Sequence, residues 1–599
     1  MLWYSSNNIE NKVSFTDAVL TGMPEDGGLW LPVEIPKLSE EFISNINRYS
    51  MKSICCKVLE MFLYPDLSQE LIRNIVTDAF NFKIPMYNID KNEYIIELYH
   101  GPTMAFKDFG SRVMALIFQH LLTKNGENYH VIVATSGDTG SAVANAFSIT
   151  DIPVTVFYPS EGVSYFQEQQ ITKYGKNITC LEVKGTFDDC QKNVKQLLKS
   201  SSNKVKYITA NSINITRLLP QMLYYFISYA GLKNKYTDLS NYKIIYSIPS
   251  GNLGNVTAGI ISKLCGLPID KFIISTNENN SFLKYLQTQN FTPCKTKKTV
   301  SNAMDVGNPS NMQRIIKLLN YEQLINIVDS YSVSDKETLQ TINYVYHKYN
   351  YLIDPHTSVG YYSINKLYPQ KTNEFTIKVT LSTASPYKFL EVVNKAISTN
   401  IKYPNNLKNY LTEKQYKISY KSNNLDIISR LINTKTIVLI GMPGSGKSTI
   451  GSQLKDYGWY WIDTDDLIIN KYQKPLIEIV NQHGDYFRTI EQNAIKSILS
   501  KTDTYRIIST GGSVVYSEES MSYLMSLGII IYLDVSFEDI IKRISNFETR
   551  GIFIPAGETF RDVYNNRKLL YQNYSNMTIN NSILNIKETT KMIDNLKMI

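Results

Sequence analysis

Short runs of apolar and β-branched residues recur along the first part of the chain, and each is followed by a glycine-rich turn or a helix-like segment. Strands are predicted at residues 129–135, 152–159, 243–249 and 376–383. The turns SGDTGSA and SGNLGN follow the first and the third of these strands and lead into apolar helical sequence. This alternation predicts an α/β fold with a largely parallel sheet and helices on both of its faces. Ligands of such folds bind at the carboxyl ends of the strands.

The same pattern begins again near residue 436. Residues 437–440 are apolar and predict a buried strand, which a glycine-rich turn and an apolar-periodic helix follow. The segment in between, residues 409–435, is polar and basic without Gly or Pro, and it predicts the end of the first unit and a short helical connection. The chain is therefore divided into a first unit at residues 1–428 (an N-terminal segment and two α/β subdomains), a connection at 429–435 and a second unit at 436–599.

Composition narrows the class of protein. The chain has 599 residues, 43% hydrophobic and 19% charged, which is typical of a globular protein with several packed cores. No apolar run reaches the ~18 residues of a membrane span, and the N-terminus has no secretory pattern. Six scattered cysteines are too few for a disulfide scaffold and predict a cytoplasmic protein. The net charge of +8 without a long basic run predicts small anionic ligands, and neither nucleic acid nor a membrane as partner.

Three segments of the first unit carry candidate chemistry: residues 97–112, 134–142 and 249–255. Each glycine-rich turn follows a strand and opens a helix, so its N–H groups can hold a phosphate, although a tight turn also has purely structural uses. Lys107 follows the apolar residues Met104, Ala105 and Phe106. Such a setting lowers the pKa of an amine, as Schiff-base chemistry requires. The plainer alternative is a surface lysine that pairs with Asp108.

Taken together, the segments HGPTMAFKDFG, TSGDTGSA, NSINITRLLPQ, PSGNLGN and SNAMDVGNPSN resemble the threonine synthase family. The resemblance extends over residues 13–389, nearly the whole first unit. It implies the tryptophan-synthase-β-like fold (fold type II) of pyridoxal-phosphate enzymes. It also implies the conversion of O-phosphohomoserine and water into threonine and phosphate.

The resemblance carries over to individual residues. It implies that Lys107 is the Schiff-base lysine and that Thr383 faces the pyridine nitrogen of the cofactor. The cofactor phosphate would be held by Gly251, Asn252, Leu253, Gly254 and Asn255. Candidates for holding the anionic substrate are Ser136, Asp138, Thr139, Asn211 and Arg217. For His100 and His356, ligand contact and a structural role stay open. The family motif T-A-H-P reads Thr383-Ala384-Ser385-Pro386 here, which puts one cofactor or substrate contact in doubt.

The second unit opens with a phosphate-binding motif. Residues 441–448 fit G-x-x-x-x-G-K-[ST] in full, between the predicted strand and helix that such a P-loop requires. Lys447 is expected to reach the β- and γ-phosphates of ATP, and Ser448 to bind Mg²⁺. The full set of expected ATP-binding residues here is Gly441, Gly444, Ser445, Gly446, Lys447, Ser448 and Thr449.

The rest of the second unit resembles the shikimate kinase family and implies a P-loop NTPase-type kinase domain with a parallel sheet. The resemblance implies that Asp463 orders the Mg²⁺ water shell and Asp465 takes the acceptor hydroxyl. Further implied residues are Arg488 and Arg567 for the acceptor carboxylate, Gly511 and Gly512 in the acceptor turn, Arg543 near adenine and the lid arginine Arg550. Two positions depart from the family: Ser513 replaces the third glycine, and Gly551 replaces a proline in the lid.

These departures leave the phosphate acceptor open. The first hypothesis is a bifunctional enzyme whose kinase phosphorylates homoserine, the precursor of the synthase substrate. The second is a shikimate kinase, and the third is a regulatory ATP-binding module without turnover. The expected ligands are pyridoxal 5′-phosphate, ATP, Mg²⁺, O-phosphohomoserine and homoserine or shikimate. A homo-oligomer is compatible with the sequence.

Overall fold

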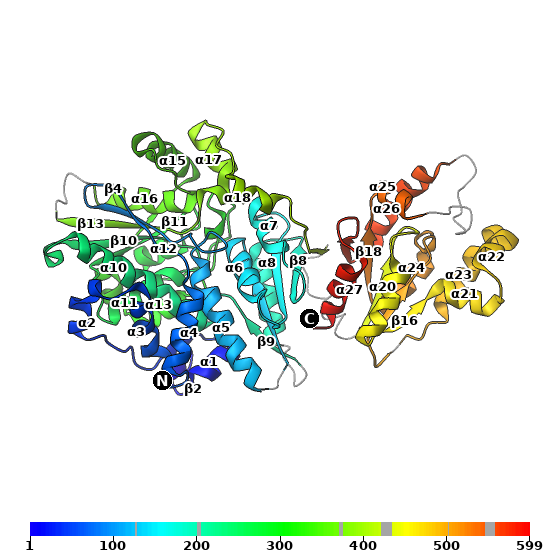
Figure 1. The fold of residues 1–599 in the computed structure, drawn as a ribbon, viewed down its shortest axis with the longest axis horizontal. Coiled ribbons are helices and arrows are strands. Elements are labelled where there is room, and N and C mark those ends of the chain that lie inside the picture. The colour runs from blue at the N-terminus through cyan, green and yellow to red at the C-terminus, as the bar shows by residue number, and fades with distance from the viewer. Residues whose placement is uncertain are drawn as a thin grey trace. The chain divides into compact units, whose positions relative to one another are not determined.

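The computed structural model describes residues 1–125, 128–199, 205–369, 375–420, 434–500, 502–544 and 558–598. Two compact units are distinguished (Figure 1). The first comprises Met1–Ile152, Gly162–Ile171 and Ser200–Thr412, and the second comprises Pro153–Glu161, Thr172–Lys199 and Glu413–Ile599. This division follows spatial clustering, and the division of the sequence at residues 428 and 436 stays a prediction.

The first unit is built around a six-stranded sheet. Its strand order is β12 (Val328–Ser332), β11 (Lys271–Thr276), β10 (Lys243–Pro249), β13 (Thr376–Ser382), β5 (Glu93–Glu97) and β4 (Met86–Asp90). All neighbours are parallel except β4, which is antiparallel to β5. Every residue of β13 is buried, which is typical of a central strand in a parallel sheet that is covered on both faces. The sheet confirms the predicted strands at 243–249 and 376–383.

Helices and smaller sheets complete this unit. A second parallel pair is formed by β6 (Tyr129–Ala134) and β9 (Lys206–Thr209), and an antiparallel sheet by β2 (Lys12–Ser14), β1 (Leu2–Ser5) and β3 (Trp30–Pro32). The principal helices are α3 (Met51–Leu63), α4 (Gln69–Ala79), α5 (Lys107–Asn125), α6 (Asp138–Phe147), α7 (Tyr165–Thr172), α10 (Leu223–Lys235), α11 (Gly254–Leu264), α15 (Asp335–Tyr349), α16 (Pro355–Leu367) and α17 (Leu390–Ile397). Three of them, α5, α6 and α11, begin within the three segments that the sequence marks as candidates for chemistry.

The second unit contains five parallel strands in the order β16 (Tyr460–Asp463), β17 (Arg506–Ser509), β15 (Thr436–Ile440), β18 (Ile529–Asp534) and β19 (Met577–Asn580). Its helices here are α20 (Lys447–Leu454), α21 (Thr464–Tyr472), α22 (Leu476–His483), α23 (Phe487–Lys496), α24 (Glu518–Leu527), α25 (Phe537–Arg543), α26 (Phe560–Tyr574) and α27 (Ile586–Asn595). The central strands are buried in an aliphatic core that includes Val438, Ile508 and Ile530. Because these strands are parallel, the carboxyl ends of β15, β16 and β17 lie at the same end of the sheet.

The second unit also contains the pair β7 (Val154–Pro159) and β8 (Ile178–Val183), helix α8 (Phe187–Lys199) and the short strand β14 (Ile418–Tyr420). Strand β7 confirms the strand predicted at 152–159. Within the segment 409–435, residues 418–420 form a strand, and residues 421–433 of the predicted helical connection lie outside the described residues.

No helix within the described residues is long and apolar enough to cross a membrane. All six cysteines lie in the described ranges, and none of them is part of a disulfide. Four of them are buried, where desolvation raises the pKa of the thiol, as for Cys180, to about 12.

Candidate active sites

Lys107 is the first residue of α5 and lies beside the end of β13. The Phe106 amide donates to the Thr383 carbonyl at 2.9 Å, and Ala105 bridges Ala384, so the backbone just before the lysine is fixed to the strand end. The Lys107 amine lies 4.4 Å from the centroid of the Phe106 ring. Burial, reinforced by Arg217, lowers the pKa of Lys107 to about 8. Among the described residues the amine has no hydrogen bond or ion pair, so it is available to a ligand.

A glycine-rich turn between β10 and α11 supplies a cradle for an anion. Leu253 adopts a left-handed conformation, and α11 begins at Gly254. The first N–H groups of a helix have no acceptor within the helix, and the helix dipole favours negative charge there. A Cβ at Gly251 would lie 2.9 Å from the Cα of Met304, so only glycine allows this close approach. The turn thus suits a phosphate group.

Side chains brace this turn. Asn252 donates to Ser212 Oγ at 2.8 Å and accepts from the Ser310 amide at 2.5 Å. The side-chain carbonyl oxygen of Asn255 accepts hydrogen bonds from Tyr224 and Tyr225, whereas its buried Nδ2 has no partner among the described residues. A buried amide donor without an acceptor is costly, and a ligand at the start of α11 would satisfy it. The cradle, the unpaired amide and the free amine of Lys107 together fit pyridoxal phosphate.

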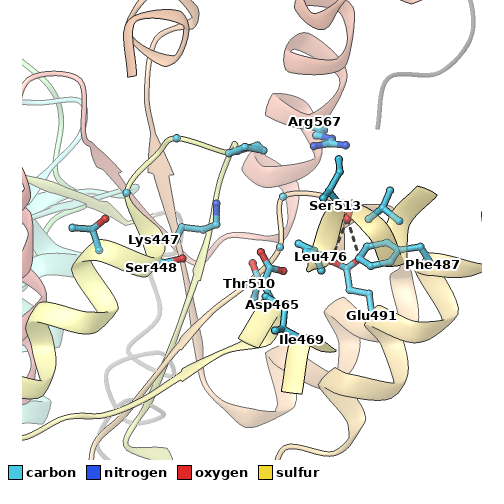
Figure 2. Close-up of a pocket in the computed structure, with 18 of the residues that line it drawn as sticks. Lys447, Ser448, Asp465, Ile469, Leu476, Phe487, Glu491, Thr510, Ser513 and Arg567 are labelled. Carbon is cyan, nitrogen blue, oxygen red and sulfur yellow. Dashed lines mark hydrogen bonds between the residues drawn. The ribbon is translucent and has the colours of Figure 1, made fainter. Parts of the chain in front are cut away.

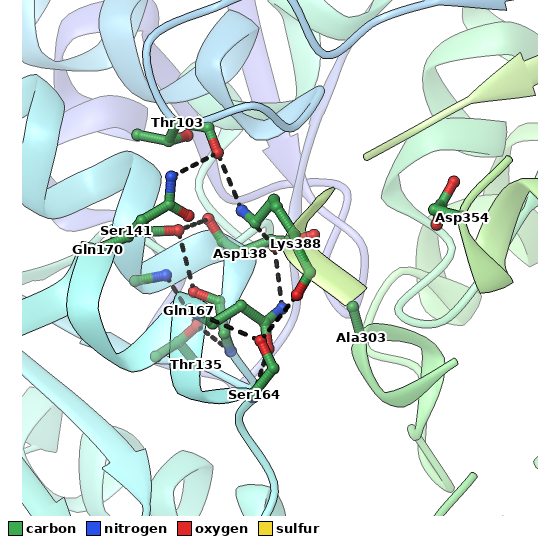
Figure 3. A network of polar contacts seen from close by, with 12 residues as sticks. Thr103, Thr135, Asp138, Ser141, Ser164, Gln167, Gln170, Ala303, Asp354 and Lys388 are labelled. Atoms are coloured by element: carbon green, nitrogen blue, oxygen red, sulfur yellow. Dashed lines mark hydrogen bonds and ion pairs between the residues drawn. The ribbon is translucent and has the colours of Figure 1, made fainter. Parts of the chain in front are cut away.

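The second glycine-rich turn, between β6 and α6, belongs to a buried polar network (Figure 3). Thr135 Oγ1 accepts from the amides of Gly137 and Gly140 at 2.9 and 2.7 Å. Asp138 accepts from Gln167 Nε2 at 3.0 Å and lies 2.6 Å from Lys388 Nζ. Burial by itself would raise the pKa of Asp138, but Lys388 and His356 hold that pKa below its ordinary value. The Asp138 carboxylate is therefore already engaged by a cation of the protein.

The other predicted substrate-binding residues of the first unit have different environments. The Asn211 side chain donates to the Ala134 carbonyl at 2.7 Å and accepts from the Ala134 amide at 3.0 Å, which joins two loops. Arg217 is buried and donates to the Ala210 carbonyl, and its Nε has no partner in the part of the chain that the structure describes. Ser136 and Thr139 lie partly exposed at the start of α6. Their roles toward a substrate stay predictions.

His100 and His356, for which the sequence left ligand contact and a structural role open, both have protein partners. The His100 ring lies 2.6 Å from a Glu97 carboxylate oxygen at a partly exposed site. His356 is buried, with Nδ1 2.6 Å from Asp354, and its Nε2 accepts from the Ala303 amide at 3.2 Å. These contacts account for both rings structurally. Ser385, at the family's histidine position, donates its amide to the Met104 carbonyl at 3.0 Å and thus helps to fix the segment before Lys107.

The phosphate-binding loop of the second unit runs from β15 to α20, as predicted. Helix α20 begins at Lys447, which donates to the carbonyls of Gly441 and Met442 at 2.8 and 3.0 Å. Asp463 caps α21 and accepts from the Asp465 amide at 3.0 Å. Arg543 lines the same cavity as the loop and donates to the Asn581 carbonyl at 2.7 Å. Arg550 lies outside the described residues.

A cavity of about 890 Å³ extends from this loop to α23 and α26 (Figure 2). Lys447, Asp465 and Arg567 line it. Burial, with repulsion from Asp463, raises the pKa of Asp465 to about 6. The structure thus brings three predicted site residues into one cavity: Asp465, which is expected to take the acceptor hydroxyl, the P-loop lysine Lys447 and the carboxylate-binding arginine Arg567.

Three further side chains shape the far end of this cavity. Tyr516 lies between the two predicted carboxylate-binding arginines: the Cζ atoms of Arg488 and Arg567 are 5.3 and 5.2 Å from its ring centroid. Ser513 Oγ lies 3.1 Å from both carboxylate oxygens of Glu491. Burial, followed by repulsion from Asp465, raises the pKa of Glu491 to about 7.

Sequence reasoning did not assign a role to Tyr516 or Lys388. A signal was present for both residues. Lys388 lies in the segment STASPYKF, which carries part of the family resemblance, and Tyr516 follows closely after the predicted acceptor turn at Gly511 and Gly512.

An unpaired lysine and an anion cradle at the carboxyl edge of a parallel sheet define the class of fold-type II pyridoxal-phosphate enzymes. Residues 88–380 match the family model "Pyridoxal-phosphate dependent enzyme". Residues 2–80 match "Threonine synthase N terminus", and residues 357–432 match "Threonine synthase, C-terminal". The chain belongs to the threonine synthase family. Residues 443–597 match "Shikimate kinase", so a P-loop kinase-type domain follows the pyridoxal-phosphate enzyme.

Individual relatives agree with this assignment. A threonine synthase of Buchnera aphidicola from Acyrthosiphon pisum is 37% identical over 414 residues, which are 68% of this chain and 94% of the relative. The crystal structure of threonine synthase from Escherichia coli has a TM-score of 0.67 at 32% identity and covers 72% of this chain and 99% of its own. The pyridoxal-phosphate-bound threonine synthase from Brucella melitensis has a TM-score of 0.65 at 28% identity, with 72% and 98% covered.

Proposed function

We propose that the first unit converts O-phosphohomoserine and water into threonine and phosphate. Pyridoxal phosphate, when bound, supplies an electron sink for charge at the substrate Cα. The Lys107 amine is placed to move the Cα proton, since its pKa of about 8 leaves a sizeable fraction unprotonated near neutral pH. The Cγ–oxygen bond breaks and phosphate leaves with the bonding pair, Cβ loses one proton and takes the hydroxyl of water, and Cγ gains a proton to become the methyl group of threonine. The free amine at the strand end is the observation that carries this proposal.

The test is Lys107→Ala in the full chain. We expect the variant to lose the visible absorbance of covalently bound pyridoxal phosphate and to form no threonine from O-phosphohomoserine. Lys388, a second buried lysine of the same unit, is paired with Asp138, so covalent attachment at Lys388 is not expected. An unchanged absorbance in Lys107→Ala would contradict the assignment.

We propose that the second unit is an ATP- and Mg²⁺-dependent kinase whose acceptor is homoserine. The acceptor hydroxyl oxygen attacks the γ-phosphorus, the bond to the leaving ADP breaks, and the hydroxyl proton passes to Asp465. Lys447, Ser448 and Asp463 would hold the triphosphate and the metal. The joint position of Asp465 and Lys447 in one cavity supports turnover over a purely regulatory role. The family match supports shikimate as the alternative acceptor.

The acceptor is tested with the intact chain. With homoserine, ATP and Mg²⁺ it should release threonine without added O-phosphohomoserine. Lys447→Ala should abolish ADP formation and spare threonine formation from O-phosphohomoserine, since the two sites are built from separate units and share no residue. Turnover of shikimate without turnover of homoserine would establish the alternative. ATP binding without turnover of either would favour the regulatory module.

A further inference from the structure

The segment at residues 301–311 carries part of the family resemblance, and the proposed function assigns no role to it. Its C-terminal end contacts the glycine-rich turn at residues 251–255. Asn311 Nδ2 donates to the Asn252 carbonyl at 3.0 Å, and the Ser310 amide donates to the Asn252 side chain at 2.5 Å. The end of this segment therefore holds the backbone of the turn that fits the cofactor phosphate.

Arg314, on the short helix α13 (Met312–Leu318), is joined to this contact. Its Nη1 donates to Asn311 Oδ1 at 2.7 Å, so a single amide side chain lies between the guanidinium and the turn. Its remaining hydrogen bonds go to three backbone carbonyls, those of Trp30 at 3.1 Å, Ser212 at 3.1 Å and Ile213 at 2.6 Å. All of these acceptors are uncharged.

Arg314 is thus a buried cation without an anionic partner. It is 0% exposed, and no carboxylate of the described ranges lies within ion-pair distance of it. Burial lowers the pKa of Arg314 to about 9 with no acidic neighbour opposing the shift, so the group is still charged at neutral pH. The buried lysines Lys378 and Lys388 of the same unit each have a carboxylate partner. A buried charge without a partner is unfavourable, and an anion that binds nearby would compensate it.

We propose that Arg314 is the buried counter-charge of the cofactor phosphate. The turn supplies N–H donors and the positive end of the α11 dipole, and Arg314 adds a full positive charge behind them. Asn311 links the two, because it accepts from the guanidinium and donates to the turn. Arg314 acts by its charge and through Asn311, so it is a positioning residue. This role rests on the proposed pyridoxal-phosphate function of the first unit.

The test compares two aldehydes that differ only in the phosphate: pyridoxal 5′-phosphate and pyridoxal. Visible absorbance of the full-length apoprotein gives the dissociation constant of each. Arg314→Gln removes the charge and keeps an amide donor. It should weaken the binding of pyridoxal 5′-phosphate about five- to fiftyfold and leave that of pyridoxal within about threefold, since only the first carries the charge on which Arg314 acts. Arg314→Lys keeps the charge without the planar fork and should recover most of the difference.

Arg112→Gln serves as a matched control. Arg112 also donates to backbone carbonyls, those of Asp78 and Ala79, and none of its contacts belongs to the turn. This variant should change both aldehydes equally or not at all. Equal weakening of both aldehydes in Arg314→Gln would identify a structural cross-link and overturn the counter-charge. An unchanged preference for pyridoxal 5′-phosphate with a raised KM for O-phosphohomoserine would assign the charge to the substrate phosphate and overturn it as well.

A measurement on the wild-type holoprotein covers the case in which Arg314→Gln does not fold. A phosphate ester in water takes up its second proton near pH 6. Phosphorus NMR of the bound cofactor should show the dianion at least about one pH unit lower, because a buried cation favours the charged form. Titration at the pH of the free ester would overturn the proposal. If the wild-type chain gains no visible absorbance with pyridoxal 5′-phosphate, the proposed function itself is wrong and the counter-charge falls with it.

Discussion

Lys388 and Asp138 form an ion pair of 2.6 Å, with side chains that are 0% and 4% exposed. Lys388 also donates to the Thr103 carbonyl at 2.9 Å, close to the start of α5. The negative charge of Asp138 raises the pKa of Lys107, whereas burial lowers that pKa by a larger amount. The pair therefore limits the charge that Asp138 presents to the reactive lysine.

Removing one partner of this pair should be costly. Lys388→Met leaves a buried carboxylate without its cation, and we expect a loss of about 3–5 kcal/mol in the free energy of unfolding. The double variant Lys388→Met/Asp138→Asn should recover most of that loss. Denaturant unfolding measures the free energy of unfolding of the single and the double variant. Lys388→Met should also raise the pKa of Lys107, because the negative charge of Asp138 is then no longer balanced by Lys388.

Lys378, which forms a buried pair with Glu93, provides the matched control. Lys378→Met should destabilise the fold to a similar degree and leave the pKa of Lys107 unchanged. A pKa shift of equal size in both variants would show that the shift reflects general destabilisation.

The lowered pKa of Lys107 predicts how the cofactor attaches. The neutral amine is the reactive form, so the rate at which apoenzyme gains visible absorbance with pyridoxal phosphate should rise about tenfold per pH unit and level off above pH 8. An ordinary lysine would show this rise up to about pH 10.4. Stopped-flow absorbance over pH 6–10 gives the profile, and Lys107→Arg should show none.

Tyr516 should position the two arginines of the acceptor cavity. Tyr516→Leu removes the aromatic face and should raise the KM for the acceptor about three- to thirtyfold, since each cation–π contact contributes about 0.5–2 kcal/mol. Tyr516→Phe keeps the ring and should stay within about threefold of wild type. The KM for ATP should not change in either variant. Equal effects of Leu and Phe would instead assign the role to the hydroxyl.

Local sequence determined the chemical segments of this protein. Strand, glycine turn and helix start follow one another within a few residues at residues 243–255 and 436–448, and the structure reproduces both. Such units depend on backbone conformation and short-range periodicity, which neighbouring residues specify. Lys107 was predicted through the resemblance of its segment HGPTMAFKDFG to a known family, and its role as the Schiff-base lysine stays a prediction.

Tertiary structure alone decided which side chains meet. Asp138 and Lys388 are far apart along the chain, and so are Arg488 and Arg567, which share Tyr516. Their proximity depends on helix packing and strand order, which side-chain periodicity leaves undetermined. Asp138, predicted as a substrate contact, is held by a lysine. Burial makes the Asp138–Lys388 pair strong, because charges interact far more strongly away from water.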